Sequence, residues 1–323
     1  MYLNKTFIFI SFLLMALNAN AIFGLKGRQE QKEQIAKARK AFAEENYPET
    51  IRLMKDFTIK DAPKRRIKRA YFLIADSYIA MEEYDKAMLT LSEALEFYPK
   101  DIELHLTLAG VYYICDLNSR AIEEYEQVLK QDKDNPNAIL GLAQAMLKEG
   151  FYNKACEYFK KYIELTNSQA ANVYYNYAKS NYMANNFEPA LELAFISFEQ
   201  NENPDTKFLI AKIYKSQGKL EKALLTIRDA WLMDINRKDI YLTYAMWTAY
   251  EPTKAKQGLE MAQDYLKKHP QNRLALFIEY IAYTRLGKGT KAKEVLRKIT
   301  ALQEKGFIDS VAAKILENSK SGK

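Results

Sequence analysis

The sequence of 323 residues predicts an all-α solenoid, because small residues recur along it at a nearly constant step. One series of alanines advances by 33 to 35 residues at a time: Ala75, Ala109, Ala143, Ala178, Ala211 and Ala245. A second series follows the first at a distance of twelve residues: Ala87, Ala121, Ala155, Ala190 and Ala223. Short side chains let two helix backbones approach closely, so two small positions per unit indicate stacked helices rather than one globular core.

Each unit is predicted to contain two amphipathic helices joined by a tight turn. Apolar residues recur at spacings of three and four on both sides of the turn, which is the helical pattern. Seven residues after the first alanine lie residue types that tolerate a helix end or a left-handed turn: Glu82, Asp116, Gly150, Asn185 and Gly218. Aromatic residues such as Tyr78 and Tyr84 stand three and nine positions after the same alanine.

This pattern resembles the tetratricopeptide repeat (TPR) family. In the second unit, the family's small, aromatic and helix-stopping positions are filled by Ala75, Tyr78, Tyr84, Ala87, Ala94 and Pro99. The resemblance covers nearly all of the chain beyond the first thirty residues. It implies a right-handed superhelical solenoid of about eight helix-turn-helix repeats, and it implies a non-catalytic scaffold that binds a protein or peptide.

The solenoid is expected over residues 31–306, with repeats that start near residues 31, 68, 102, 136, 171, 204, 238 and 273. The seventh repeat is irregular, since Pro252 falls in its turn and Gly258 and Ala262 replace the usual small residues. We expect no domain boundary inside the array, and Pro252 is the best candidate for a change of superhelical pitch. Residues 307–323 are expected to form a capping helix and tail, because the last repeat has no neighbour to cover its apolar side.

The N-terminus predicts export. Lys5 precedes an apolar run over residues 7–17, and residues 19–21 form a small-x-small cleavage site, which is the order of a secretory signal peptide. The run is shorter than the roughly 20 residues of a membrane-spanning helix. We therefore expect a signal peptide at residues 1–21, a short linker at 22–30 and a mature protein in the bacterial periplasm. A membrane anchor that is not cleaved is the alternative.

No catalytic or metal-binding pattern is present in the sequence, so no enzyme activity, catalytic residue, metal or cofactor is expected. His105 and His269 are the only histidines, and nothing surrounds them at the spacing of metal ligands or of a catalytic triad. A packing role is expected for His105. Cys115 and Cys156 are the only cysteines. We expect two small buried residues, with a disulfide between adjacent repeats as the alternative.

The resemblance implies that the first helix of each repeat lines a concave groove for the partner. The family's groove positions correspond to Phe72, Asp76, Leu106, Tyr113, Leu140, Gln144, Tyr175, Lys179, Tyr182, Phe208, Lys212, Lys215, Leu242 and Met246. In the early repeats these positions are mostly apolar, so the Lys/Asn/Arg clamp of the family's cytosolic chaperone adaptors is not reproduced. The main contact patch is expected in the fifth and sixth repeats, where aromatic residues stand beside lysines.

The net charge of +7 is spread over the chain except for one basic segment: Lys64, Arg65, Arg66, Lys68 and Arg69. Cations are disfavoured at the start of a helix by the helix dipole. A solvated helix start is one interpretation of this segment. Contact with an acidic partner or an anionic membrane surface is the other.

Two further functions compete with an exported scaffold. The first is a membrane-anchored adaptor subunit of an envelope secretion or assembly machine. The second is an RNA-binding protein, since pentatricopeptide repeats have a similar period. The aromatic and alanine positions fit the tetratricopeptide pattern better, and a secretory signal does not suit a protein that binds RNA. No nucleic acid is therefore expected as a partner.

Overall fold

The computed structural model describes residues 29–55 and 64–303, and these residues form helices joined by short turns, with no strand among them. The chain divides into two compact units, Met1–Ser168 and Gln169–Lys323. The division falls in the loop that follows Asn167, where the backbone takes a left-handed conformation with φ 50°. The repeat spacing does not predict it, and Pro252, the expected place for a change of pitch, lies within the second unit.

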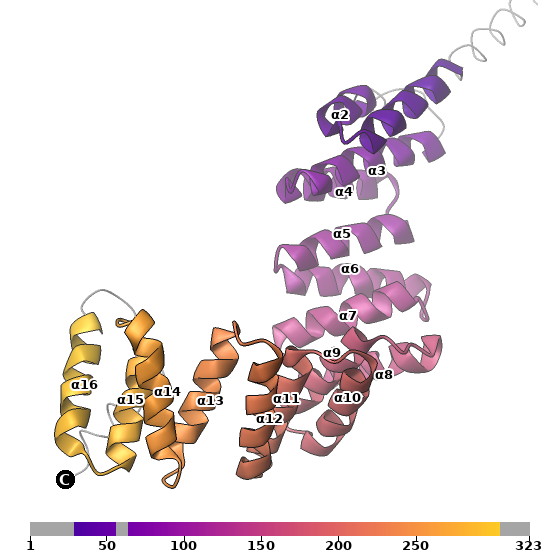
Figure 1. Ribbon diagram of the computed structural model, residues 1–323. Helices are drawn as coiled ribbons and strands as arrows, with labels where there is room; N and C mark the ends of the chain where they lie inside the picture. Colours follow the sequence, from indigo (N-terminus) through magenta and orange to yellow (C-terminus); the bar gives the residue numbers. More distant parts are fainter. Residues whose placement is uncertain (1–28, 56–63, 304–323) are drawn as a thin grey trace, which may run out of the picture. The chain divides into compact units, whose positions relative to one another are not determined.

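Unit 1 is a stack of antiparallel helices in which each helix packs on the next along the chain (Figure 1). Its described helices are residues 29–43, α2 (Tyr47–Lys55), α3 (Lys64–Ala80), α4 (Tyr84–Phe97), α5 (Ile102–Ile114), α6 (Asn118–Gln131), α7 (Pro136–Glu149) and α8 (Tyr152–Thr166). The first helices of successive repeats also touch, as α5 does with α7. They form the inner layer of the stack.

Unit 2 repeats the same arrangement (Figure 1). Its helices are α9 (Ala171–Met183), α10 (Phe187–Gln200), α11 (Pro204–Ser216), α12 (Leu220–Met233), α13 (Lys238–Tyr250), α14 (Ala255–Lys268), α15 (Arg273–Arg285) and α16 (Gly289–Gln303). Six first helices in the two units begin at the residues where we expect repeats to start. The other two are α3, which begins at Lys64, one helical turn before residue 68, and the helix of the first repeat, whose described part begins at residue 29 and not at 31.

The small residues lie where the helices approach most closely. Every alanine of the two series is 0% exposed. In the irregular seventh repeat, a Cβ added to Gly258 would lie 2.4 Å from the backbone nitrogen of Ala249. The predicted replacement of an alanine by Gly258 is therefore confirmed, because only a residue without a side chain fits against the neighbouring backbone.

The turns inside the repeats share one left-handed residue. Positive φ angles occur at the predicted positions: Glu82 (58°), Asp116 (57°), Gly150 (87°), Asn185 (63°) and Gly218 (74°). The next backbone N–H then donates to a carbonyl five residues earlier, as Leu117 does to Tyr112 at 2.9 Å. This geometry satisfies a carbonyl that the helix end leaves free. Pro252 occupies the equivalent position of the seventh repeat, and its ring excludes a positive φ.

Several expectations fall outside the described residues: the signal peptide at 1–21, most of the linker at 22–30, and the capping helix and tail at 307–323. These stay predictions. Within residues 29–55 and 64–303, no helix has both the length and the apolar character needed to cross a membrane.

Candidate partner-binding surfaces

The predicted groove residues all lie on the first helices of repeats, from α3 to α13. Most of them are partly or fully exposed, as a binding role requires. Phe208 and Leu242 are not, since only 8% and 5% of their surfaces are exposed. Their side chains belong to the packing between helices, so the assignment of these two residues as open contact positions is corrected.

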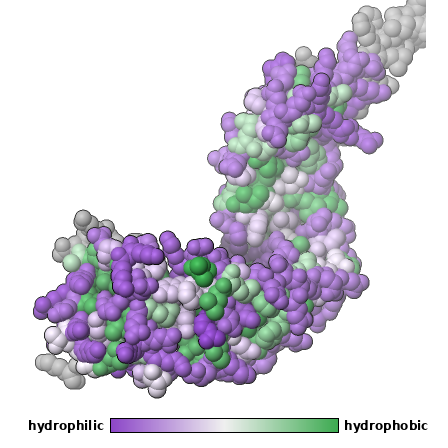
Figure 2. Space-filling model, in the orientation of Figure 1, coloured by the Kyte–Doolittle hydropathy of each residue, from purple (hydrophilic) through white to green (hydrophobic). Residues whose placement is uncertain are grey.

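Apolar surface does not mark a site on either unit. Large hydrophobic side chains are exposed at several places along both units, among them Leu89, Phe97 and Ile235. On the face shown in Figure 2, apolar residues form green patches among a mainly hydrophilic surface. Scattered apolar residues of this kind are normal on soluble proteins. The charges therefore distinguish the candidate surfaces.

The structure brings the basic segment and the first groove positions of unit 1 into one hollow, which we call the bipolar pocket. Its volume is about 400 Å³, and it is lined by Arg39, Arg65, Lys68, Arg69, Phe72, Leu73, Asp76 and Glu103. The lining comes from helix 29–43, α3 and α5, which are the first helices of three successive repeats. A neighbouring hollow shares Arg39, Arg65 and Arg69.

Two of the charges in the bipolar pocket neutralise each other. The Lys68 ammonium lies 2.6 Å from a carboxylate oxygen of Asp101 and 3.0 Å from one of Glu103. Burial disfavours the charge of Lys68, but the hydrogen bonds to Asp101 and Glu103 outweigh it, so the pKa of Lys68 is raised. Lys68 and Glu103 are therefore less available to a ligand than the other charges of the pocket.

The remaining charges of the pocket have no ion-pair partner among the described residues. This holds for the guanidinium groups of Arg39, Arg65 and Arg69, and for the carboxylate of Asp76. Burial, and then the like charge of Glu103, raises the pKa of Asp76. The pocket thus carries unpaired positive charge at one end of α3 and an unpaired negative charge further along the same helix.

The other two residues of the basic segment have local roles. Arg66 donates a hydrogen bond of 2.8 Å to the side-chain oxygen of Gln31, which joins α3 to helix 29–43. The carbonyl of Lys64 accepts a hydrogen bond of 2.8 Å from the Tyr98 hydroxyl. The segment is therefore part pocket lining and part helix-to-helix contact.

In unit 2, the predicted patch centres on two lysines. The Lys212 ammonium lies 3.9 Å from the centre of the Phe208 ring, so buried Phe208 serves as the base on which Lys212 rests. Burial lowers the pKa of Lys212, and the nearby positive charge of Lys179 lowers it further. Neither lysine forms an ion pair with a described residue. We call Tyr175, Lys179 and Lys212 the lysine patch.

The acids near the lysine patch are already engaged. Arg237 lies 2.9 Å from a carboxylate oxygen of Asp205 and 2.9 Å from one of Asp239. Tyr175 borders a small hollow of about 290 Å³ beside Asp205, and burial raises the pKa of its hydroxyl. The patch is thus an uncompensated positive surface beside a neutralised cluster.

The remaining predicted contacts do not join these two surfaces. Tyr113 is covered by Lys148, whose ammonium lies 4.2 Å from the ring centre and also pairs with Asp116 at 2.6 Å. Lys215 lies over the Trp247 ring at 5.6 Å. The other partly exposed positions on the first helices are Leu106, Leu140, Gln144, Tyr182 and Met246.

His105 is packed against neighbouring residues, and the two cysteines are not bridged. His105 is 8% exposed, with one ring nitrogen against Glu124 and the other 3.1 Å from the carbonyl of Pro99. Cys115 and Cys156 are free thiols, and burial raises the pKa of Cys156 to about 11. In the part of the chain that the structure describes, no group of three or more acidic, histidine or cysteine side chains is placed to hold a metal ion.

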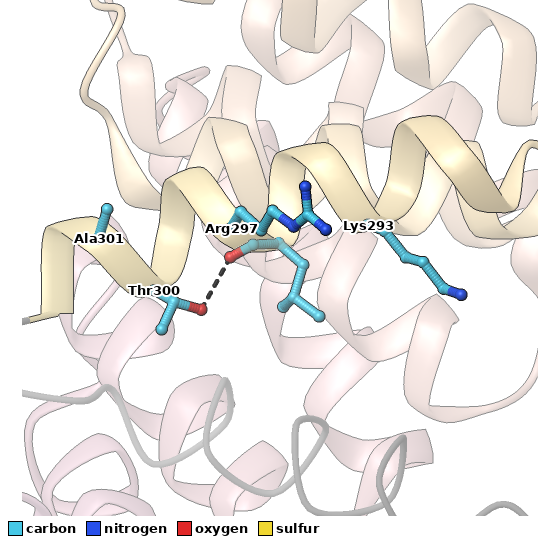
Figure 3. A pocket seen from close by; sticks show the side chains of 5 residues that line it. Lys293, Arg297, Thr300 and Ala301 are labelled. Carbon is cyan, nitrogen blue, oxygen red and sulfur yellow. Dashed lines mark hydrogen bonds between the residues drawn. The ribbon is translucent and has the colours of Figure 1, made fainter.

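A further hollow of about 400 Å³ lies on α16 and is lined by Lys293, Leu296, Arg297, Thr300 and Ala301. Figure 3 shows that these side chains come from a single helix, with the Thr300 hydroxyl donating to the carbonyl of Leu296 at 2.9 Å. No residue of a second element converges on this hollow from the described part of the chain, so we assign it no binding role.

Three residues of the bipolar pocket were missed by the sequence analysis: Arg39, Leu73 and Glu103. Arg39 is the ninth residue of a repeat that starts at residue 31, so the groove positions, applied to the first repeat, would have found it. Glu103 has no such signal. It joins the pocket because α5 packs beside α3 and α4. The periodicity of the sequence predicts this packing of helices but does not predict which charged side chains meet there.

Comparisons with known proteins identify the architecture. Two models described as "Tetratricopeptide repeat" match residues 68–101 and 118–164. The chain is a tetratricopeptide repeat protein. It is 26% identical over 247 residues to the TPR repeat-containing protein YpiA of Bacillus subtilis (strain 168). This alignment covers 73% of the TPR chain and only 56% of YpiA.

Solved structures of low sequence identity share the fold. A tetratricopeptide repeat protein from Parabacteroides merdae is 15% identical with a TM-score of 0.59, covering 84% of this TPR chain and 99% of its own. The C-terminal part of a TPR repeat-containing protein from Cytophaga hutchinsonii is 16% identical with a TM-score of 0.60, covering 76% and 98%. The TPR protein is thus an all-α repeat solenoid of a kind suited to protein–protein interaction.

Proposed function

We propose that this TPR protein is an exported, non-catalytic scaffold that binds an acidic segment of a protein partner on the lysine patch of unit 2. The observation that carries the proposal is the pair of uncompensated ammonium groups of Lys179 and Lys212, which stand in the same position of successive repeats. Two positive charges held close together repel each other, and a carboxylate from a partner would relieve that repulsion.

The aromatic surroundings support a peptide ligand. Tyr175 is partly exposed beside Lys179, and Phe208 holds Lys212 in place by a cation–π contact. Aromatic side chains supply large contact area at a low cost in conformational entropy. A partner segment with an acidic residue next to an apolar one matches this surface in both respects.

Export is proposed from the order of charge, apolar run and small residues within residues 1–21. The natural compartment is then the bacterial periplasm. Mass spectrometry of the N-terminus, on protein from fractionated cells, tests this point: a chain that begins at Ile22 in the periplasmic fraction supports it. An intact Met1 in the membrane fraction would favour the anchored adaptor, and an intact Met1 in the soluble cytoplasm would contradict both.

The binding proposal is tested with the double variant Lys179→Glu and Lys212→Glu, used as bait for partners from a native envelope extract. Captured partners should be lost or much reduced, and binding of the unchanged protein should weaken steeply with added salt. Lys179 is exposed, and substitutions at exposed positions typically change stability by about 0.5 kcal/mol or less. Lys212 is partly buried, so circular dichroism and the midpoint of thermal unfolding are measured to establish that the variant is folded.

The matched control is Lys222→Glu with Lys256→Glu. These lysines are exposed on α12 and α14, the second helices of their repeats, and their replacement changes the net charge by the same amount. The control should retain the partners. If both double variants lose the partners equally, general attraction to positive charge accounts for binding. If neither loses them, the partner binds elsewhere.

A further inference from the structure

The unpaired charges of the bipolar pocket lie along one face of α3. Arg65, Arg69, Phe72 and Asp76 follow spacings of four, three and four residues, which place them in a single row on a helix. Arg39 faces this row from helix 29–43, since it lines the same hollow. The arginines therefore stand at one end of the row, Phe72 in its middle and Asp76 at the other end.

The length of the row sets the spacing of the side chains in a ligand that would match it. Arg69 and Asp76 are seven residues apart, which corresponds to about 10 Å along a helix. In an extended peptide of polyproline II conformation, which rises about 3.1 Å per residue with three residues per turn, the same distance spans about three residues and returns to the same side of the peptide. A segment of this conformation that lies along α3 would thus place two side chains, three positions apart, beside the two ends of the row.

We propose that the bipolar pocket binds an extended protein segment in which an acidic residue and a basic residue stand three positions apart. The acidic side chain is held by Arg39, Arg65 and Arg69, whose planar groups suit a carboxylate. The basic side chain pairs with Asp76. Burial and the like charge of Glu103 disfavour the ionised carboxylate of Asp76, and a cation beside it would stabilise that form. This site is separate from the lysine patch, because its lining belongs to unit 1.

A flat anionic membrane surface fits these observations less well. The cations line a hollow with Phe72 and Leu73 in its wall, and a plane of lipid headgroups does not enter a hollow. Asp76 would also repel such a surface, whereas it adds to the binding of a segment with mixed charge. The shape and the presence of both signs therefore favour a protein segment.

The test uses four fluorescein-labelled peptides of twelve residues that differ only at two positions, three residues apart, with Leu between them. The pairs are Glu and Lys, Glu and Glu, Glu and Gln, and Lys and Lys. Fluorescence anisotropy with the purified protein should give the tightest binding for Glu and Lys, by about fivefold or more over Glu and Gln, as one added charge-assisted contact implies. The peptides are also measured on the lysine-patch variant Lys179→Glu with Lys212→Glu, which removes any binding of their acidic residues to unit 2 and should keep the preference for Glu and Lys over Glu and Gln.

Variants of the pocket give the decisive comparison. Asp76→Arg should reverse the preference, so that the Glu and Glu peptide binds more tightly than the Glu and Lys peptide. Arg65→Glu with Arg69→Glu should lose at least about tenfold in affinity for the Glu and Lys peptide. The control, Lys37→Glu with Lys40→Glu, has the same change of charge on exposed positions outside the pocket lining, and it should retain binding.

Circular dichroism and the midpoint of thermal unfolding establish that each variant is folded before its affinity is interpreted. Equal affinity of the unchanged protein for the Glu and Lys, Glu and Glu, and Glu and Gln peptides would overturn the proposal, because Asp76 would then play no part. It would also be overturned if Asp76→Arg left the order of the peptides unchanged. Binding to phosphatidylglycerol vesicles without binding to any peptide would assign the arginines to a membrane surface instead.

Discussion

The two units present unpaired charge in different ways on the same helical framework. In unit 1, Arg39, Arg65 and Arg69 stand in a hollow with Asp76, so both signs are present within one pocket. In unit 2, Lys212 rests on the Phe208 ring with Lys179 near it, and the nearby Asp205 and Asp239 are engaged by Arg237. The repeat thus determines where a side chain stands, and its neighbours determine whether its charge remains available.

This difference also shows that the residues that build the fold are not the residues that distinguish the two units. The buried alanines and left-handed turns are alike in both units, and they carry no information about a partner. Asp76 and Lys212 occupy corresponding groove regions but have opposite charge and opposite shifts of pKa. A single repeat protein can therefore carry two surfaces of different charge without any change of fold.

The largest expected effect is a loss of stability on substitution at close helix contacts, which can be compared between the two units. Gly258→Ala in unit 2 should lower the free energy of unfolding by about 1–3 kcal/mol, because the added methyl group meets the backbone of Ala249. Ala121→Leu in unit 1 should cost a similar amount, since Ala121 is fully buried. Chemical denaturation measures both.

The control for this comparison is Gly110→Ala, on α5 in unit 1. No atom lies within 4 Å of a Cβ added at Gly110. Alanine should therefore stabilise the protein there by up to about 1 kcal/mol, as it does in open helix positions. Destabilisation by Gly110→Ala, or an unchanged stability in Gly258→Ala, would show that the packing of the units is not as described.

A smaller effect tests whether the turns of the two units are equivalent. Gly150→Ala and Gly218→Ala should each destabilise the protein by about 1–2 kcal/mol, because both glycines have a positive φ, 87° and 74°. Asp116→Gly should act in the opposite direction, since Asp116 holds the same conformation with a side chain. Unequal costs at Gly150 and Gly218 in thermal unfolding would mean that the units differ in their turns as well as in their charges.

The smallest effect comes from the two unpaired charges and depends on pH in opposite ways. Asp76→Asn and Lys212→Met should each raise the midpoint of unfolding slightly at pH 7, because each removes a charge that folding desolvates. The folded pKa of Asp76 is raised above its usual 3.8, so the gain from Asp76→Asn should vanish as the pH falls from the raised value towards 3.8.

For Lys212 the sign is reversed. Its folded pKa is lowered from the usual 10.5, so unfolded chains bind more protons than folded ones between the lowered value and pH 10.5. The gain from Lys212→Met should therefore vanish as the pH rises through that range. A gain that is constant from pH 4 to pH 10 in either variant would contradict the assigned charge environment.

Much of the fold was predictable from the sequence because its causes are local or periodic. The helix starts at residues 102, 136, 171, 204, 238 and 273 follow from the spacing of small residues. The left-handed turns follow from residue types such as Gly150 and Asn185, and the irregular seventh repeat follows from Pro252 and Gly258. The division after Ser168 does not follow from any of these, since the periodicity continues across it.

The binding surfaces were predictable only in part. The family's groove positions located Phe72, Asp76, Lys179 and Lys212 on the first helices, as the structure has them. The same rule also selected Phe208, which is buried, because a position in a repeat does not state how a neighbouring side chain such as Lys212 covers it. Exposure depends on the size and conformation of neighbours that vary between repeats.

The sequence by itself determined that this is a solenoid of paired helices, where most of its helices begin and where its turns reverse the chain. Only the tertiary structure decided which charges are neutralised. Lys68 pairs with Asp101 and Glu103, and Lys148 with Asp116, across more than thirty residues of sequence, whereas Arg69 and Asp76 find no such partner in the described chain. The physical reason is range: a turn or a small residue acts through its immediate neighbours, but an ion pair requires side chains from different helices to meet within about 4 Å.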